Sequence, residues 1–204
     1  MELPKIVIEH LEPNLSCWLL FEYENASKIF KKKVWFTNVK SKDVRKKLKK
    51  LGAVRRQSVL KIFPHEKLVI LDPHAKKTVE PKDLKNSVAV VGGILGGYPA
   101  RGRTKILLTS KAPNAKAKNL GREQFTIDGA TYITKKIIEG KKISAIHIKH
   151  GLVLNAKLEP HGVYEVELPY AYPVAAGKPV ISKKLVHYLM KIKNPKIAWR
   201  NRST

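Results

Sequence analysis

The sequence contains very little cysteine and no long apolar run, and each absence excludes a class of protein. Cys17 is the single cysteine among 204 residues, so neither an internal disulfide nor the CxxC spacing of a zinc ribbon is present. Cys17 borders an apolar stretch, which favours a buried thiol over a nucleophile. The longest apolar run, residues 88–95, is far shorter than the roughly 20 residues of a membrane-spanning helix. Residues 1–10 also lack the apolar core of a signal peptide. We therefore expect a soluble, cytoplasmic protein without a metal centre.

Acidic residues are scarce as well. The chain has 41 Lys and Arg residues against 16 Asp and Glu, a formal net charge of +25. Such a charge attracts polyanions. The alternative is that the charges only solvate the surface, as in heat-adapted proteins. Such proteins, however, are enriched in both Lys and Glu, whereas acids are scarce in this chain. Anionic membranes bind basic amphipathic helices with aromatic anchors, and neither end of the chain has one. RNA is therefore the expected partner, with no DNA and no membrane.

The basic residues are concentrated in three regions. Residues 31–61 carry 13 basic side chains against one acid while keeping the apolar period of a helix. Residues 101–122 follow a glycine-rich segment, and residues 191–204 form a basic tail. The candidate RNA-binding residues are Lys31, Lys32, Lys33, Arg45, Lys46, Lys47, Lys49, Lys50, Arg55, Arg56, Arg101, Arg103, Lys196, Arg200 and Arg202.

Apolar periodicity predicts an α/β fold. We expect strands at 5–9, 34–39, 67–72 and 87–91, and helices at 18–30, 41–51, 104–109 and 125–139. Ser41 is placed to cap the second helix, and Gly52 and Gly140 are placed to end the second and the fourth. We expect coil at 110–118, strands and turns at 143–181, and a closing helix at 182–192. The sheet is expected to be mainly parallel, with a small strand-rich C-terminal extension.

A glycine-rich segment, GGILGG at residues 92–97, follows the strand expected at 87–91. Glycines in this position let a ligand approach the backbone, although a tight turn would need them equally. The spacing does not match GxGxxG, and no GxxxxGK occurs, which excludes a dinucleotide fingerprint and a P-loop. Arg101 and Arg103 follow, where their guanidinium groups could hold phosphates or a base.

Neither the histidines nor the acidic residues form a recognisable metal site or catalytic pair in the sequence. His147 and His150 fall in an expected strand, where an odd offset points the two rings to opposite faces, so no metal site is expected. The Asp and Glu residues are too scattered for a carboxylate pair. Sequence chemistry alone names no catalytic residue.

Four segments together carry a resemblance to a known family. IEHLEPNLSCWLLFEY (8–23), LDPHA (71–75), GGILGGYPARGRT (92–104) and NLGREQFTIDGA (119–130) resemble the SPOUT-class methyltransferases, which use S-adenosylmethionine. That family includes a yeast enzyme that methylates an arginine of ribosomal protein S3. The resemblance covers residues 6–192 and implies a basic, archaeal-type member. It also implies a C-terminal trefoil knot, a rare exception to unknotted topology.

The resemblance further implies a division of the chain and a cofactor site. Residues 1–142 would form the knotted α/β domain, residues 143–192 the strand-rich part of the same folding unit, and residues 193–204 a basic tail. S-adenosylmethionine would lie above a short segment made of Leu71, Asp72 and Pro73. One wall of its site would be formed by Gly92, Gly93, Ile94, Leu95 and Gly96. The other wall would be formed by Leu120, Gly121, Gln124 and Phe125.

Two positions depart from the family pattern. Family members read GGILGD and RDRT, whereas Gly97 and Gly102 occupy the two aspartate positions in this chain. A carboxylate there could orient a cationic acceptor or accept a proton, and glycine can do neither. Like-charge repulsion also disfavours a free basic peptide as the acceptor of a +25 protein.

Three functions remain open. The first expectation is a ribosomal-RNA-binding protein associated with the small ribosomal subunit and its proteins, either a catalytically silent family member or one that still transfers methyl groups. The second is an RNA methyltransferase that visits the ribosome. The third is a protein-arginine methyltransferase of ribosomal protein S3.

Overall fold

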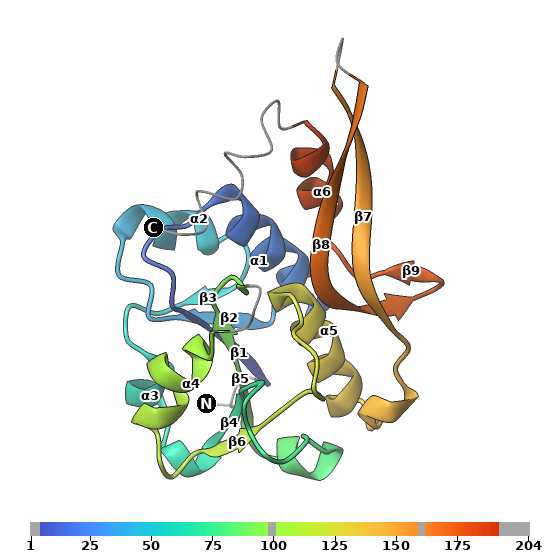
Figure 1. The fold of residues 1–204 in the computed structure, drawn as a ribbon. Coiled ribbons are helices and arrows are strands. Elements are labelled where there is room, and N and C mark those ends of the chain that lie inside the picture. The colour runs from blue at the N-terminus through green and yellow to red at the C-terminus, as the bar shows by residue number, and fades with distance from the viewer. Residues whose placement is uncertain (1–4, 98–100, 159–161, 192–204) are drawn as a thin grey trace.

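Six parallel strands form the central sheet of the protein. In the computed structural model, which describes residues 5–97, 101–158 and 162–191, the strand order is β3-β2-β1-β5-β4-β6 (Figure 1). The strands are β1 (Ile6–His10), β2 (Val34–Thr37), β3 (Ala53–Val54), β4 (Leu68–Leu71), β5 (Val88–Gly93) and β6 (Lys116–Lys118). All neighbours in this sheet pair in parallel, which confirms the predicted α/β class.

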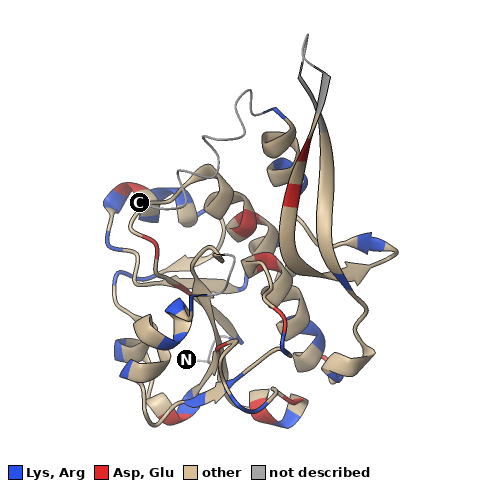
Figure 2. Ribbon diagram, viewed as in Figure 1, with Lys and Arg blue, Asp and Glu red and all other residues tan. Residues whose placement is uncertain are grey.

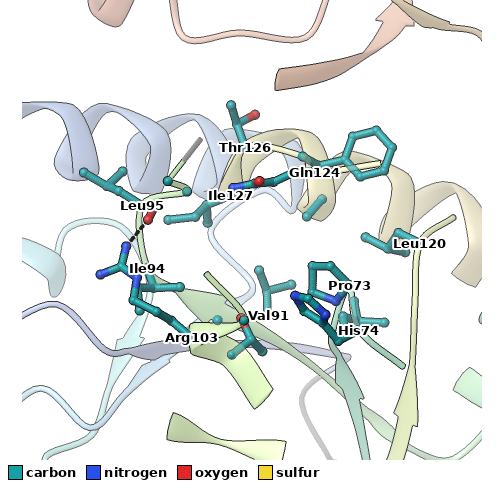
Figure 3. Close-up of a pocket in the computed structure, with 18 of the residues that line it drawn as sticks. Pro73, His74, Val91, Ile94, Leu95, Arg103, Leu120, Gln124, Thr126 and Ile127 are labelled. Atoms are coloured by element: carbon teal, nitrogen blue, oxygen red, sulfur yellow. Dashed lines mark hydrogen bonds between the residues drawn. The ribbon is translucent and has the colours of Figure 1, made fainter. Parts of the chain in front are cut away.

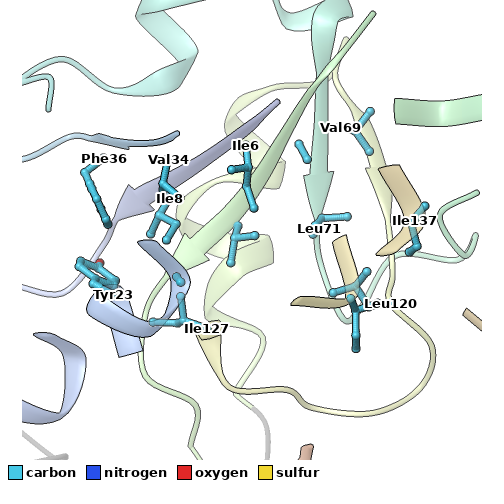
Figure 4. Close-up of a cluster of buried hydrophobic side chains, with 14 of the residues drawn as sticks. Ile6, Ile8, Tyr23, Val34, Phe36, Val69, Leu71, Leu120, Ile127 and Ile137 are labelled. Carbon is cyan, nitrogen blue, oxygen red and sulfur yellow. The ribbon is translucent and has the colours of Figure 1, made fainter. Parts of the chain in front are cut away.

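Helices cover both faces of the sheet, because parallel strands are apolar on both sides. They are α1 (Cys17–Ile29), α2 (Lys42–Leu48), α3 (Val59–Ile62), α4 (Arg103–Leu107) and α5 (Ile127–Ile138), with 3-10 turns at His65–Lys67, Pro81–Leu84, Thr109–Lys111 and Ile143–Ala145. Within β1, Ile6 and Ile8 join the apolar cluster under α1 and α5, whereas Val7 joins the cluster under α3. Figure 4 shows the first of these clusters.

Short polar contacts fix the helix ends. Ser41 accepts a hydrogen bond from the Val44 amide at 3.4 Å and caps α2, as predicted. Gly140 has φ +91° and follows the last turn of α5, also as predicted. Gly52 does not end α2, which stops at Leu48. A Cβ atom at Gly52 would lie 2.2 Å from the Val34 carbonyl oxygen, so the close approach of β2 requires glycine there.

A second, antiparallel sheet follows α5. It contains β7 (Ile148–Leu158), β8 (Gly162–Ala175) and β9 (Lys178–Pro179) in the order β7-β8-β9. Leu185 and Leu189 of α6 (Lys183–Met190) pack with Trp18 of α1 and the inner face of β8. A bridge between Phe125 and Ala171 joins this sheet to the chain entering α5. Figure 1 shows the long β7–β8 hairpin beside α6, away from the central sheet.

Besides the role of Gly52, two local predictions are wrong. The expected coil at 110–118 contains β6, a short edge strand whose lysines give no apolar alternation. The thiol of Cys17 is exposed, because Cys17 is the first residue of α1 and the inward positions fall to Trp18 and Leu19. The knot and the division at residue 142 stay predictions. No helix in residues 5–97, 101–158 and 162–191 combines the length and apolarity needed to span a bilayer.

Candidate active site

A pocket opens at the carboxyl ends of β4 and β5, beside the start of α5 (Figure 3). Ligands of parallel α/β sheets bind at this edge. The cavity measures about 100 Å³, and the empty space reaches about 810 Å³ when the mouth that opens to solvent is included. The pocket is therefore an open cleft that a ligand can enter from solvent.

Three segments that are distant in the sequence build the pocket. The chain leaving β4 forms the floor, the glycine-rich segment after β5 forms one wall, and residues 120–127 form the other. In Figure 3, Ile94 and Leu95 lie on one side of the pocket, and Pro73 and Leu120 lie on the other. Nine of the twelve residues predicted for the cofactor line it. They are Leu71, Pro73, Gly92, Ile94, Leu95, Gly96, Leu120, Gln124 and Phe125.

Asp72 does not line the pocket. Its side chain is 1% exposed and lies behind the floor. One carboxylate oxygen accepts a hydrogen bond from the His74 amide at 2.9 Å, and the other accepts one from the Thr109 hydroxyl at 2.7 Å. Asp72 therefore holds the turn that presents Pro73 and His74 to the pocket.

Gly93 and Gly121 also lie outside the pocket lining. A Cβ atom at Gly93 would lie 2.2 Å from the Tyr23 hydroxyl and 2.7 Å from the Glu9 carbonyl oxygen, so this glycine faces α1 and β1. Gly121 has φ +93°, and its amide donates to the Asn119 side chain at 2.9 Å. Both glycines shape the backbone behind the walls, and their contact with the cofactor stays a prediction.

Sequence reasoning overlooked several lining residues. His74, Thr104, Glu123 and Thr126 line the pocket, and all four stand inside the segments that carry the family resemblance. Glu123 is the one carboxylate among the described lining residues, and it lies 3.3 Å from His150 of β7. Within the described residues, no group of three or more His, Cys, Asp or Glu side chains is arranged to hold a metal ion.

An ion pair fixes the glycine-rich wall. The Glu12 carboxylate accepts a hydrogen bond from the Leu95 amide at 2.8 Å and lies 3.3 Å from the Arg103 guanidinium. The same guanidinium donates to the Leu95 carbonyl oxygen (Figure 3). The Glu12–Arg103 pair therefore holds both backbone polar groups of Leu95. Arg103, predicted to bind RNA, is engaged in the pocket wall, whereas Arg101 is exposed at its rim.

Buried carboxylates join α1 to the first turn of α5. Glu22 accepts hydrogen bonds from the Trp18 indole at 2.6 Å and from the Ile127 amide at 2.9 Å. Asp128 accepts one from the Asn25 side chain at 2.8 Å. Burial raises the pKa of Asp128, and its hydrogen bonds oppose that shift. These contacts set where α5 begins and thus where its first turn meets the pocket.

The predicted basic region 31–61 does not form one face. Lys31, Lys32, Lys33, Lys49 and Lys50 lie at the amino-terminal ends of β2 and β3, Arg55 and Arg56 follow the carboxyl end of β3, and Lys46 and Lys47 are exposed on α2. Two arginines make contacts within the protein. The guanidinium of Arg45 donates to the Val39 and Lys40 carbonyl oxygens, and that of Arg55 lies 4.5 Å from the Trp35 ring centre. Lys196, Arg200 and Arg202 lie outside the described residues. RNA contact by this set stays a prediction.

Comparison with known proteins identifies the family. The family model described as "Protein arginine N-methyltransferase SFM1-like" matches residues 5–195. The chain belongs to the SFM1-like family. The curated relative "Protein arginine N-methyltransferase SFM1" of Saccharomyces cerevisiae (strain ATCC 204508 / S288c) is 28% identical in an alignment that covers 92% of this chain and 94% of the relative. The predicted SPOUT-class methyltransferase family is thereby confirmed.

Solved structures share the fold of this SFM1-like chain. The yeast arginine methyltransferase SFM1 complexed with SAM has a TM-score of 0.78 at 25% identity, over 91% of this chain and 89% of that one. The MTA complex of the yeast enzyme has a TM-score of 0.71 at 25% identity, over 90% of this chain and 98% of that one. A dual specific Trm10 from Thermococcus kodakaraensis, with a TM-score of 0.53 at 14% identity over 68% of this chain and 94% of its own, shows the fold alone.

Proposed function

We propose that this SFM1-like protein is an S-adenosylmethionine-dependent methyltransferase whose acceptor is an arginine side chain of a protein. The pocket at residues 71–73, 92–97 and 120–127 carries the proposal, because it occupies the ligand-binding edge of a fold shared with a SAM-bound arginine methyltransferase. The comparisons thus favour the third of the open functions over the first expectation, a ribosomal-RNA-binding protein.

The residues of the pocket fit this cofactor. Leu95, Leu120 and Phe125 offer apolar surface suited to an adenine ring, and Gly92 leaves backbone within reach of a ligand. A Cβ atom at Gly96 would lie 2.3 Å from the side-chain nitrogen (Nε2) of Gln124, so glycine lets the two walls approach each other. When bound, S-adenosylmethionine supplies a methyl group on a positively charged sulfur.

Glu123 is the residue we assign to the acceptor. An acceptor nitrogen that gains a methyl group must release a proton, and a carboxylate both attracts a guanidinium and can receive that proton. Gly97 and Gly102 line the pocket without a carboxylate, which leaves Glu123 as the acid of the described lining. Its side chain is 42% exposed beside His150, so an acceptor arriving from solvent can reach it.

The proposed partners are ribosomal RNA and the proteins of the small ribosomal subunit, with ribosomal protein S3 as the acceptor that the family resemblance implies. A protein of charge +25 repels a free basic peptide. RNA around the acceptor supplies negative charge, which removes that objection. The acceptor is therefore proposed to be presented within the subunit.

Labelled methyl transfer tests this proposal. Salt-washed small subunits of the source organism are incubated with methyl-tritiated S-adenosylmethionine and the full chain, and the label is then traced. We expect methylarginine in one ribosomal protein. Glu123→Gln should incorporate at least tenfold less label, because loss of an acid–base group typically slows a reaction by about 100-fold or more. Label in the RNA would favour the RNA methyltransferase. No label, together with no binding of S-adenosylmethionine, would favour the silent family member.

A further inference from the structure

Two consecutive lysines adopt a backbone conformation that is unfavourable for lysine. In the turn after α1, Lys31 has φ +50° and Lys32 has φ +63°. Glycine or asparagine is the usual residue for this left-handed conformation after a helix, because a Cβ atom makes it costly. The amides of Lys31 and Lys32 donate to carbonyl oxygens in the last turn of α1, and the Lys33 amide donates to that of Phe30, which caps the helix, so the turn is fixed. A strained turn built from charged residues suggests a role for those charges.

A second pair of lysines stands beside this turn. Lys49 and Lys50 follow the end of α2 and lead to Gly52, where a Cβ atom would lie 3.4 Å from the Lys32 carbonyl oxygen. The Ser27 hydroxyl of α1 donates to the Leu51 carbonyl oxygen at 2.5 Å, which ties the two helix ends together. Lys31, Lys32, Lys33, Lys49 and Lys50, here called the amino-edge surface, are all exposed.

The charge of the amino-edge surface is not neutralised within the protein. In the part of the chain that the structure describes, ion pairs join Glu139 to Lys135 and Lys136, but none reaches the five lysines of the surface. The end of α5 adjoins it, since the Lys135 ammonium donates to the Ile29 carbonyl oxygen at 3.0 Å. Figure 2 shows red segments on β8, in the second sheet, where Glu165 and Glu167 lie.

We infer that the amino-edge surface binds the phosphate backbone of folded RNA and anchors the enzyme at a distance from its pocket. Ammonium groups contact phosphates as point charges and need no base sequence. The surface lies at the opposite end of the strands from the pocket, and β1 alone, with five residues, spans about 16 Å. Bound RNA therefore leaves the pocket free for a protein acceptor.

Neither the helix dipole nor a membrane accounts for the five lysines as well as RNA does. Cations near a helix C-terminus complement the helix dipole, but Lys28 already does this for α1 from within its last turn, and the effect does not require lysines at positive φ. Membrane attachment needs apolar anchors beside the charges. The exposed large apolar side chains of the described residues are Ile106, Val153, Tyr188 and Met190, and none of them belongs to α1 or α2.

A double substitution that removes charge while relieving strain tests the inference. In Lys31→Gly/Lys32→Gly, glycine suits the left-handed turn, so we expect an unfolding temperature equal to or above that of the wild type. The affinity of the full chain for a fluorescent 30-nucleotide RNA hairpin should fall about tenfold at low salt, and the slope of log K against log salt should shrink by about 1.5. Lys49→Gln/Lys50→Gln should give a similar loss without any change in the turn.

Two exposed lysines beyond β4 provide the matched control. Lys76→Gln/Lys77→Gln should reduce the affinity for the hairpin by less than threefold. Equal losses of RNA affinity in all three variants would show a diffuse charge effect and overturn the inference. Variants that bind the hairpin normally but lose binding to phosphatidylserine vesicles or to polyglutamate would overturn it as well. The Kd for S-adenosylmethionine should be unchanged in every variant. The inference does not rest on methyl transfer, so a wild-type protein that binds RNA here but not the cofactor would refute only the proposed function.

Discussion

Replacing Glu12 by glutamine tests how the glycine-rich wall of the pocket is held. The Glu12 carboxylate binds the Leu95 amide at 2.8 Å and lies 3.3 Å from the Arg103 guanidinium, which also binds the Leu95 carbonyl. Glutamine keeps an oxygen for the Leu95 amide but removes the charge. The variant should therefore fold with its wall less firmly positioned.

The expected size follows from the exposure of the two side chains. Hydrogen bonds to charged groups contribute about 1.5–3 kcal/mol when buried, and exposed ion pairs about 0.2–1 kcal/mol. The Glu12 side chain is 17% exposed and that of Arg103 is 35% exposed, which places this pair between those limits. A loss of about 1 kcal/mol raises the Kd for S-adenosylmethionine about fivefold. Since the wall is local, the unfolding temperature should fall by only a few degrees.

Calorimetry with S-adenosylmethionine on Glu12→Gln, Arg103→Gln and the double variant completes this test. The two single changes act on one pair, so the double variant should lose less affinity than their sum. Lys105→Gln removes a charge from the exposed side of α4 and serves as the control. Strictly additive losses, or wild-type affinity in both single variants, would refute the positioning role of the Glu12–Arg103 pair.

Two further predictions concern stability. Gly93→Ala should destabilise the fold by about 3 kcal/mol in urea unfolding, because its Cβ would lie 2.7 Å from the Glu9 carbonyl oxygen and 2.2 Å from the Tyr23 hydroxyl. A loss under about 1 kcal/mol would show that β1 and α1 can move apart at little cost and would contradict this prediction. Burial lowers the pKa of His10 from its ordinary 6.5, so its contribution to stability is present above pH 6.5 and is lost as the pH falls through the lowered folded-state pKa. In the His10→Gln variant, the free energy of unfolding should therefore decline less between about pH 7 and about pH 5. A decline equal to that of the wild type would show that other groups cause it.

The sequence predicts the central architecture because its signals are local and periodic. The strand expected at 87–91 is apolar at four consecutive positions, 88–91, and glycines follow at once, so the sequence predicts both the strand and the turn toward the pocket. Ser41 caps α2 through a contact with Val44, three positions along the chain. The lining residues of the pocket come from the continuous segments that carry the family resemblance, and nine of the twelve residues expected at the cofactor line it. Their contact with the cofactor stays a prediction.

Long-range contacts explain what the sequence could not predict. Glu12 binds Leu95 across 83 positions, and nothing near either residue indicates the other. Gly93 resembles its neighbours in the glycine-rich segment, yet it faces Tyr23, because successive residues of a strand point to opposite sides. The lysines of the amino-edge surface fall in two runs, and only the return of the chain through α2 brings them together.

The central claim is that the pocket at the carboxyl ends of β4 and β5 binds S-adenosylmethionine. Titration calorimetry of the full chain measures this directly, with Gly96→Val as the comparison, because a side chain there meets Gln124 at 2.3 Å and the Tyr170 ring at 2.8 Å. We predict one site per chain with a Kd of about 1–100 μM, and at least a tenfold loss in Gly96→Val at unchanged fold by circular dichroism. Absence of heat at millimolar ligand, or equal binding by the variant, would contradict the assignment of this pocket.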